Sequence, residues 1–150
     1  MKKVLVYVIT CIMIASSVSA MPGSKVLQTF HSTFPNAQNV KWRDDKAGYF
    51  VSFTQNENFN KVFYNTDGNL VYALKYCSVD GLPNNIIMQL NEKYGASKIL
   101  GVTEVTTQSN MFYNVKLSKD DKLYCLDLSA DGSLTKQEVF DDGASATTAQ

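Results

Sequence analysis

Apolar residues recur at helical spacing in two stretches of the chain and at alternate positions in most of the rest. The first stretch predicts a helix with Ser24 as its N-cap and Pro35-Asn36 as its end. In the second, Pro83 suits a first helical turn and Gly95 a C-terminal cap. The two apolar stripes match at an offset of 60 positions, and their members are Val26, Leu27, Phe30 and Phe34 in the first and Ile86, Ile87, Leu90 and Tyr94 in the second.

After each predicted helix the period of the apolar residues drops to two, which is typical of strands with one buried face. Asp67-Gly68 and Asp131-Gly132 are hairpin signals, so neighbouring strands are expected to pair antiparallel. The helices must then cover one face of the sheet. The predicted strands are 40–43, 48–55, 60–65 and 69–76 after the first helix, and 99–106, 111–118, 122–129 and 133–140 after the second.

The stretch from Tyr49 to Leu70 recurs 64 positions later, from Tyr113 to Leu134, with its parts in the same order. Because the helices match at 60 positions and the strands at 64, the second copy carries four extra residues, which we expect to form a longer loop or strand around Val105 to Asn110. The predicted fold class is α+β. Two tandem repeats, each a helix and a four-strand antiparallel meander, span about 24–77 and 82–140 and form one curved sheet with the helices on one face.

Alternation along the strands divides their residues between the two faces of the sheet. The set expected beneath the helices is Val51, Phe53, Val62, Tyr64, Leu70, Tyr72, Leu74, Tyr113, Val115, Leu117, Tyr124, Leu126, Leu128 and Leu134. The set expected on the outer face is Phe50, Ser52, Lys61, Phe63, Val71, Ala73, Lys75, Phe112, Asn114, Lys116, Cys125 and Asp127.

The chain begins with the pattern of a secretory signal peptide, residues 1–20: Lys2-Lys3, an apolar run, and the small residues Val18-Ser19-Ala20 as a cleavage site. The apolar run is too short for a membrane span, so we expect export to the periplasm or beyond, with cleavage near Ala20 and no span in the mature chain. Residues 21–140 then make one domain, and residues 141–150, which lack periodicity, make a flexible tail.

Charge and cysteine content narrow the possible partners. The full chain has 14 basic and 14 acidic residues, and removal of Lys2 and Lys3 leaves the mature chain at a net charge of −2. No basic stripe indicates nucleic-acid binding. Cys77 and Cys125 remain in an oxidising compartment, either as one disulfide or as two half-buried thiols, and the residues leave both alternatives open.

Residues with catalytic or metal-binding chemistry do not form a recognisable set. His31 is the sole histidine and is expected on the solvated side of its helix, and neither mature cysteine has a flanking sequence that lowers a thiol pKa. Oxygen-bearing residues in 65–69 and 129–133 suggest calcium only faintly, because hairpin turns explain them without a metal. We therefore expect no enzyme, no catalytic residues, no metal and no cofactor.

The expected outer face mixes aromatic side chains with hydroxyls, amides and lysines. Such a face can dock a protein or peptide, because Phe and Tyr supply contact area at low entropic cost. A plain structural role, in which the phenylalanines only pack across strands, accounts for the pattern equally well. The candidate partner-binding residues are Phe50, Ser52, Lys61, Phe63, Lys75, Phe112 and Lys116.

The order and spacing of several short motifs resemble the exported PepSY-like, or β-lactamase-inhibitor-like, proteins across nearly all of the mature chain. The second copy departs from the pattern, with Gly95-Ala96 in place of Phe-Pro and no Trp around Thr106. The motifs are Phe30-x-x-x-Phe34-Pro35-x-Ala37-x-x-Val40-x-Trp42, Tyr49-x-Val51-x-Phe53, Val62-x-Tyr64-x-x-Asp67-Gly68, Leu82-Pro83-x-x-Ile86 and Asp131-Gly132-x-Leu134.

The resemblance implies tandem helix-plus-four-strand units in which one curved sheet presents a concave face to a partner, although fold does not fix function. The leading hypothesis is an exported, non-enzymatic binding protein that docks a protein or peptide on this face, with inhibition of an envelope or extracellular hydrolase as one form of the role. The alternative is a periplasmic carrier or sensor that holds a small ligand between helices and sheet near Trp42, Tyr64 and Tyr72.

Overall fold

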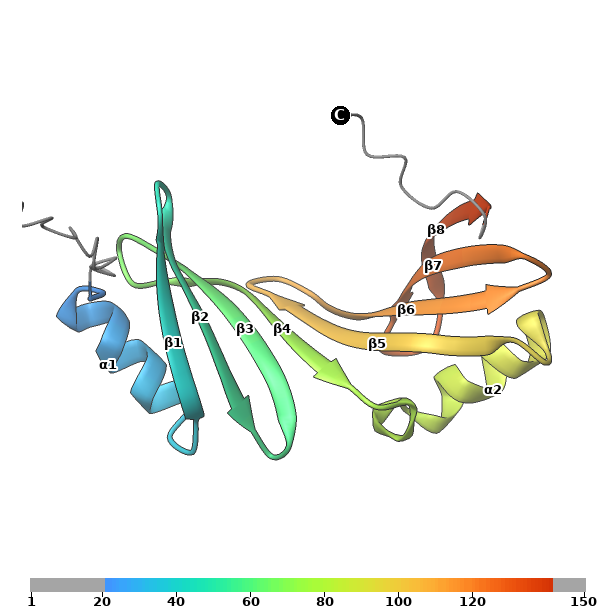
Figure 1. Ribbon diagram of the computed structural model, residues 1–150, viewed down its shortest axis with the longest axis horizontal. Coiled ribbons are helices and arrows are strands. Elements are labelled where there is room, and N and C mark those ends of the chain that lie inside the picture. The colour runs from blue at the N-terminus through green and yellow to red at the C-terminus, as the bar shows by residue number, and fades with distance from the viewer. Residues whose placement is uncertain (1–20, 142–150) are drawn as a thin grey trace, which may run out of the picture.

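A computed structural model describes residues 21–141 (Figure 1). The predicted signal peptide and residues 142–150 of the predicted tail lie outside this range. The first half of the described chain contains α1 (Ser24–Thr33), β1 (Gln38–Asp45), β2 (Gly48–Gln55), β3 (Asn58–Asn65) and β4 (Leu70–Cys77). After a 3-10 turn, η1 (Val79–Gly81), the second half contains α2 (Asn84–Tyr94), β5 (Lys98–Thr107), β6 (Met111–Lys119), β7 (Lys122–Ser129) and β8 (Leu134–Asp141).

Both predicted helices are present, with ends set by their neighbouring residues. Ser24 is the first residue of α1 and not its N-cap; that place belongs to Gly23, without a capping side chain. Pro83 is the residue before α2, where its missing N–H costs nothing. Gly95 ends α2 with a positive φ of 57°, which glycine adopts without steric cost, as its predicted role requires.

The eight strands form one antiparallel sheet in sequence order, from β1 at one edge to β8 at the other. This confirms the antiparallel α+β class and the predicted strand succession; β2 and β7 have the predicted ends. The Asp-Gly turns also form as predicted, because Gly68 and Gly132 have φ values of 82° and 91° and donate their N–H groups to the carbonyls of Asn65 and Ser129. Within residues 21–141, no helix is both long and apolar enough to cross a membrane.

A bulge in β4 reverses the predicted faces from Tyr72 onward, whereas Leu70 packs against the first core as predicted. Tyr64 pairs with Leu70 but Phe63 pairs with Tyr72, so Val71 is an extra residue in the ladder. Tyr72 and Leu74, predicted beneath the helices, therefore lie on the outer face, while Ala73 packs against the buried core. Lys75, predicted on the outer face, lies on the helix side. The same shift recurs in β8, where Leu128 pairs with Leu134 and Asp127 with Lys136.

The expected longer loop or strand around Val105 to Asn110 is an extension of the β5–β6 hairpin, in which β5 runs to Thr107 and β6 begins at Met111. In the first hairpin Asp45 pairs with Gly48, and in the second the corresponding pair is Val105 and Phe112, beyond which the ladder continues to Thr106 and Met111. This extension pairs with β4 of the first half, through Ala73 with Thr106 and Tyr72 with Thr107. The amide of Gln108 at the tip also donates to the carbonyl of Leu70, at 3.0 Å. The extended hairpin thus joins the two halves.

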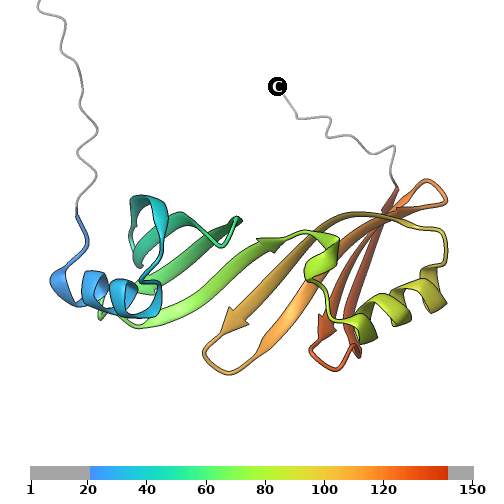
Figure 2. The ribbon, with the colours of Figure 1, turned by 90° about the horizontal axis from the view of Figure 1, so that it is seen from below.

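The helices lie at opposite ends of the molecule on one face of the sheet, each above its own core (Figure 2). The first core contains Val26, Phe30, Val51, Phe53, Val62 and Tyr64; the second contains Leu82, Ile86, Leu90, Tyr94, Val102, Tyr113, Val115, Leu117, Leu126 and Leu128. Between them a polar strip crosses the same face, formed by Asn60, Lys75, Glu104 and Thr106. The Lys75 amine lies 3.4 Å from the Glu104 carboxylate and pairs β4 with β5.

Within the described part of the chain the sheet is open, so β1 and β8 each present one side that no strand of residues 21–141 pairs with. A register shift between Gln38 and Lys41 interrupts β1, and Asn39 there has a φ of 54°. The remainder of β1 carries Lys41 and Arg43 on the outer face. On β8, Lys136 and Glu138 form an ion pair at 2.8 Å.

Cys77 and Cys125 are both free thiols and half-buried, which agrees with the second of the two predicted alternatives. They lie on opposite faces of the sheet with two strands between them. Cys77 pairs with Val102 and packs against the second core, whereas Cys125 pairs with Lys116 and Glu138 on the outer face.

Candidate functional site

Three aromatic rings stand side by side on the outer face of the first half. Phe50 on β2, Phe63 on β3 and Tyr72 on β4 occupy consecutive positions of one cross-strand row. The ring centroids of Phe50 and Phe63 are 4.6 Å apart, and those of Phe63 and Tyr72 are 5.7 Å apart. Such contacts fix the orientations of rings that helices do not cover.

A second aromatic pair lies four residues further along β3 and β4. Phe59 and Tyr76 pair across the strands with centroids 5.7 Å apart, and they are exposed to 45% and 38%. The Lys61 amine lies over both rings, 5.7 Å from the Phe59 centroid and 5.8 Å from that of Tyr76. Lys61 thus stands between the two sets of rings on β3, because side chains two apart share a face.

Two further cations come from β1. Arg43 pairs with Phe50, and its guanidinium carbon lies 4.8 Å from the centre of that ring. Lys41 pairs with Ser52, which pairs with Lys61 on its other side, so a small hydroxyl side chain separates two lysines. A cation held over an aromatic face is attracted by the negative face of the ring, which orients it without neutralising its charge.

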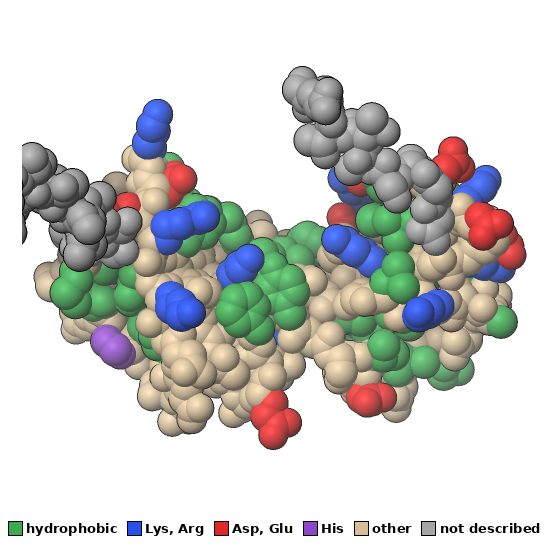
Figure 3. All heavy atoms as spheres, in the orientation of Figure 1, with side chains coloured by type: hydrophobic (Ala, Val, Ile, Leu, Met, Phe, Trp, Pro, Cys, Tyr) green, Lys and Arg blue, Asp and Glu red, His purple; other side chains and the backbone are tan. Residues whose placement is uncertain are grey.

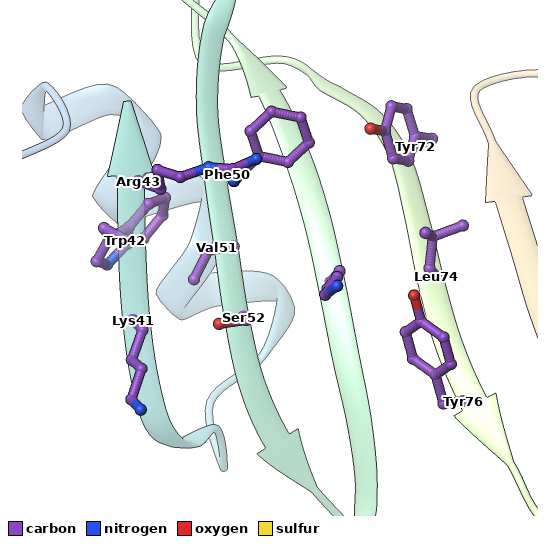
Figure 4. Close-up of a pocket in the computed structure, with 10 residues that line it drawn as sticks. Lys41, Trp42, Arg43, Phe50, Val51, Ser52, Tyr72, Leu74 and Tyr76 are labelled. Carbon is purple, nitrogen blue, oxygen red and sulfur yellow. The ribbon is translucent and has the colours of Figure 1, made fainter. Parts of the chain in front are cut away.

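Most of these side chains line a groove of about 310 Å³ in the outer face, hereafter the aromatic groove (Figure 4). Phe63 is not a lining residue, but its ring contacts those of Phe50 and Tyr72, which are. Figure 4 shows Ser52 near its middle, with Lys41 on one side and Leu74 and Tyr76 on the other. Figure 3 shows basic side chains around hydrophobic ones over this half, with acidic side chains at its margin. The lining residues are Lys41, Trp42, Arg43, Phe50, Val51, Ser52, Lys61, Tyr72, Leu74 and Tyr76.

The structure brings together only part of the predicted partner-binding set. Phe50, Ser52, Lys61 and Phe63 share the outer face of the first half, as expected. Phe112 and Lys116 share this face but belong to the second half.

Lys75 does not belong to the outer face. It lies on the helix side in the polar strip, where it pairs with Glu104. The prediction of its face was wrong, because the bulge at Val71 shifts the alternation of β4 by one residue.

The three residues of the alternative ligand site are not gathered in one place. Trp42 and Tyr64 lie beneath α1, where the Phe30 ring fills the space at 5.2 Å from Trp42. Tyr72 lies on the opposite face. Burial raises the pKa of Tyr64 to about 12, and its hydroxyl has no hydrogen-bond partner among the described residues. This region is a packed core.

Sequence reasoning missed several groove residues, namely Lys41, Arg43, Leu74 and Tyr76. The predicted first strand, 40–43, was too short to be matched with its neighbour, whereas β1 runs from Gln38 to Asp45. Placing Lys41 and Arg43 opposite Ser52 and Phe50 across the Asp45–Gly48 hairpin would have identified them. For Leu74 and Tyr76 the sequence offers no comparable signal, because no residue of β4 marks the position of its bulge.

The remaining polar residues serve structural roles. His31 is exposed, with its ring against Phe30 at 5.5 Å. Hydrogen bonds from Ser129 and Ser133 hold the pKa of the Asp131 carboxyl below its usual value, so these oxygens organise a turn. Over residues 21–141, no three His, Cys, Asp or Glu side chains gather into a group that could hold a metal.

The fold is similar to solved structures of Bacteroides proteins. A BLIP-like protein from Bacteroides fragilis NCTC 9343 superposes with a TM-score of 0.73 at 16% identity, covering 86% of this chain and 94% of that one. A DUF2874 family protein from Bacteroides ovatus ATCC 8483 gives 0.71 at 26% identity, covering 83% and 92%. A proposed periplasmic protein from Bacteroides eggerthii DSM 20697 gives 0.70 at 17% identity, covering 83% and 94%.

These likenesses establish a BLIP-like fold. No protein-family model matches the chain, and no curated protein matches it by sequence. Membership of the PepSY-like proteins, which the motifs suggested, therefore stays a prediction.

Proposed function

We propose that this protein is an exported, non-enzymatic binding protein that docks an extended segment of a protein partner in the aromatic groove. The observation that carries the proposal is the uncovered row of Phe50, Phe63 and Tyr72 on a rigid sheet. Aromatic side chains lose little conformational entropy on binding and commonly act as interface anchors. Inhibition of an envelope or extracellular hydrolase is one form that this role can take.

Residues 1–20 and the similar solved structures further support the proposal that the protein is exported and binds a partner. Residues 1–20 have the pattern of a signal peptide, and one structural neighbour is described as a proposed periplasmic protein. The BLIP-like neighbour has a similar fold over most of its length. We also propose that the two halves are tandem repeats, since helix and strand positions correspond at offsets of 60 and 64 residues and both halves carry the same bulge.

The carrier alternative is less well supported, because Phe30 occupies the space near Trp42 and Tyr64. Between the halves, a separate cavity of about 250 Å³ adjoins the polar strip. A small molecule that copurifies with the protein and is detected by native mass spectrometry would favour the carrier role over docking.

The test is a selection of phage-displayed random peptides on the wild-type protein. Peptides that dock in the groove will lose binding to Phe63→Ala and keep it with Phe140→Ala, a matched phenylalanine on the outer face of β8 that is 49% exposed. Both variants should remain folded by far-UV circular dichroism. Peptides that bind both variants equally, or no selected peptides at all, would contradict the proposed function.

A further inference from the structure

We infer that the segment docked in the aromatic groove is acidic, with a carboxylate side chain seated over Ser52 between Lys41 and Lys61. This inference rests on the proposed function and names the chemistry of the partner. It starts from an imbalance of charge. The whole chain has equal numbers of basic and acidic residues, yet the outer face of the first half gathers Lys41, Arg43 and Lys61.

Among residues 21–141, no ion pair joins Lys41, Arg43 or Lys61 to a carboxylate. The two ion pairs of that range, Lys75 with Glu104 and Lys136 with Glu138, lie elsewhere. Asp45, the nearest outer-face acid on β1, accepts a hydrogen bond from the backbone of Ala47 at the hairpin tip. The cations therefore repel one another in the free protein, and an incoming carboxylate relieves that repulsion.

The outer face of the second half provides an internal contrast. There the acidic residues already have partners: Asn114 donates to Asp127 at 2.6 Å, and Lys136 pairs with Glu138 at 2.8 Å. The positions that correspond to Phe50 and Phe63 are Asn114 and Asp127. The unneutralised positive charge and the aromatic row thus occur together, only in the half that has the groove.

The geometry places the carboxylate at one point. Lys41 and Lys61 lie on the strands flanking Ser52, so their backbones are roughly 10 Å apart, twice the usual spacing between strands. A carboxylate above the short serine side chain is within reach of both long, flexible amines. Lys61 also has an aromatic ring set on either side of it along β3, at Phe63 and Phe59.

That order of side chains predicts the sequence pattern of the ligand. Along β3 the outer face reads Phe63, Lys61 and Phe59, at alternate residues. An extended segment lying along this strand also presents alternate residues to one face, with the same spacing. The matching segment is therefore apolar, then acidic, then apolar at every second residue. A nucleic acid is a poorer fit, because three cations in a small groove give few phosphate contacts.

The experiment sequences the peptides whose binding depends on Phe63 in the selection above. We expect an excess of Asp and Glu flanked two residues away by apolar residues. Replacing that acid by its amide in the synthetic peptide should weaken binding, as should Lys41→Gln and Lys61→Gln in the protein, each by about fivefold. Lys98→Gln, an exposed lysine at the far end of β5, should have no effect.

Added salt provides a readout that altered packing would not give. Raising the ionic strength should weaken binding to the wild type and have much less effect on the Lys41→Gln, Lys61→Gln double variant. Phe63-dependent peptides without acidic residues, bound equally by both lysine variants, would overturn the carboxylate assignment and leave docking intact. Absence of Phe63-dependent peptides would overturn both proposals. Binding of a fluorescent oligothymidylate as tightly as the best peptide would overturn the assignment to an acidic peptide.

Discussion

Each half of this protein consists of one helix and four antiparallel strands, and the two halves differ in what they place on the outer face. Beneath the helices, corresponding positions are apolar in both: Val51 with Val115, Phe53 with Leu117, and Val62 with Leu126. On the outer face, Phe50 and Phe63 correspond to Asn114 and Asp127. Buried positions are constrained by close packing, whereas an uncovered sheet face tolerates polar and aromatic side chains alike. The difference teaches that the outer face is where the halves can acquire separate roles.

The largest effect should come from the smaller core. Phe30 is buried and its ring contacts those of Phe34, Trp42 and Phe53, so Phe30→Ala should lower the free energy of unfolding by about 3–5 kcal/mol. Leu90→Ala at the corresponding place in α2 should cost about 2–5 kcal/mol. Urea unfolding followed by circular dichroism measures both. A loss below about 1 kcal/mol for Phe30→Ala would show that α1 is not a stabilising part of the fold.

A smaller effect should follow from shortening the β5–β6 hairpin to the length of the β1–β2 hairpin. Replacing residues 106–111 by Asn-Gly removes the pairing of β4 with Thr106 and Thr107 and the Gln108 bond to Leu70. At about 1 kcal/mol per hydrogen bond, we expect a loss of roughly 2–3 kcal/mol. The unfolding of the first half, reported by Trp42 fluorescence, should then separate from the overall transition seen by circular dichroism.

The control for this variant replaces only Gln108-Ser109 by Asn-Gly, which preserves the strand lengths. It should lose the side-chain bond to Leu70 and keep the two transitions coincident. Coincident transitions in the shortened hairpin as well would show that its extension does not couple the halves.

The smallest effect concerns Tyr64, whose counterpart in the second half is Leu128. Because the buried hydroxyl lacks a partner among the described residues, Tyr64→Phe should change the free energy of unfolding by no more than about 1 kcal/mol at neutral pH. Burial raises its pKa from 10.0 to about 12, so the folded state favours the neutral phenol. Stability should therefore be intact below pH 10 and fall as the pH rises from 10 to 12.

Thermal unfolding between pH 10 and 12 tests whether Tyr64 causes this loss of stability. Tyr64→Phe should lose less stability than the wild type, with a residual loss from Tyr94 and Tyr113, whose pKa values burial also raises. If the wild type and Tyr64→Phe lost stability equally as the pH rose, Tyr64 would not be its cause.

Most of the fold could be predicted from the sequence because apolar alternation and Asp-Gly turns depend on short stretches of the chain. Alternation placed β2 and β7 at their observed ends, and the Asp-Gly turns fixed the hairpins. Alternation gave the wrong faces in β4, where the bulge at Val71 places Tyr72 and Leu74 on the outer face and Lys75 on the helix side. A bulge depends on the twist of paired strands, and alternation along one strand does not reveal it.

The candidate site was predicted in part for the same reason. Phe50, Ser52, Lys61 and Phe63 lie on regularly paired strands, so their shared face followed from parity. Tyr72 and Leu74 depended on the bulge. Lys41 and Arg43 depended on the register of β1, and in an edge strand with little burial the apolar pattern that would fix the register is weak.

The open edge at β1 has a consequence for the behaviour of the protein in solution. An unpaired strand edge is a template for pairing with another chain, and natural proteins limit this with charged residues and bulges. Here the irregularity near Asn39 and the cations Lys41 and Arg43 provide both. If these cations also recognise an acidic ligand, the same side chains guard against aggregation. Natural selection could then not exchange them freely for apolar residues, even where tighter binding would result.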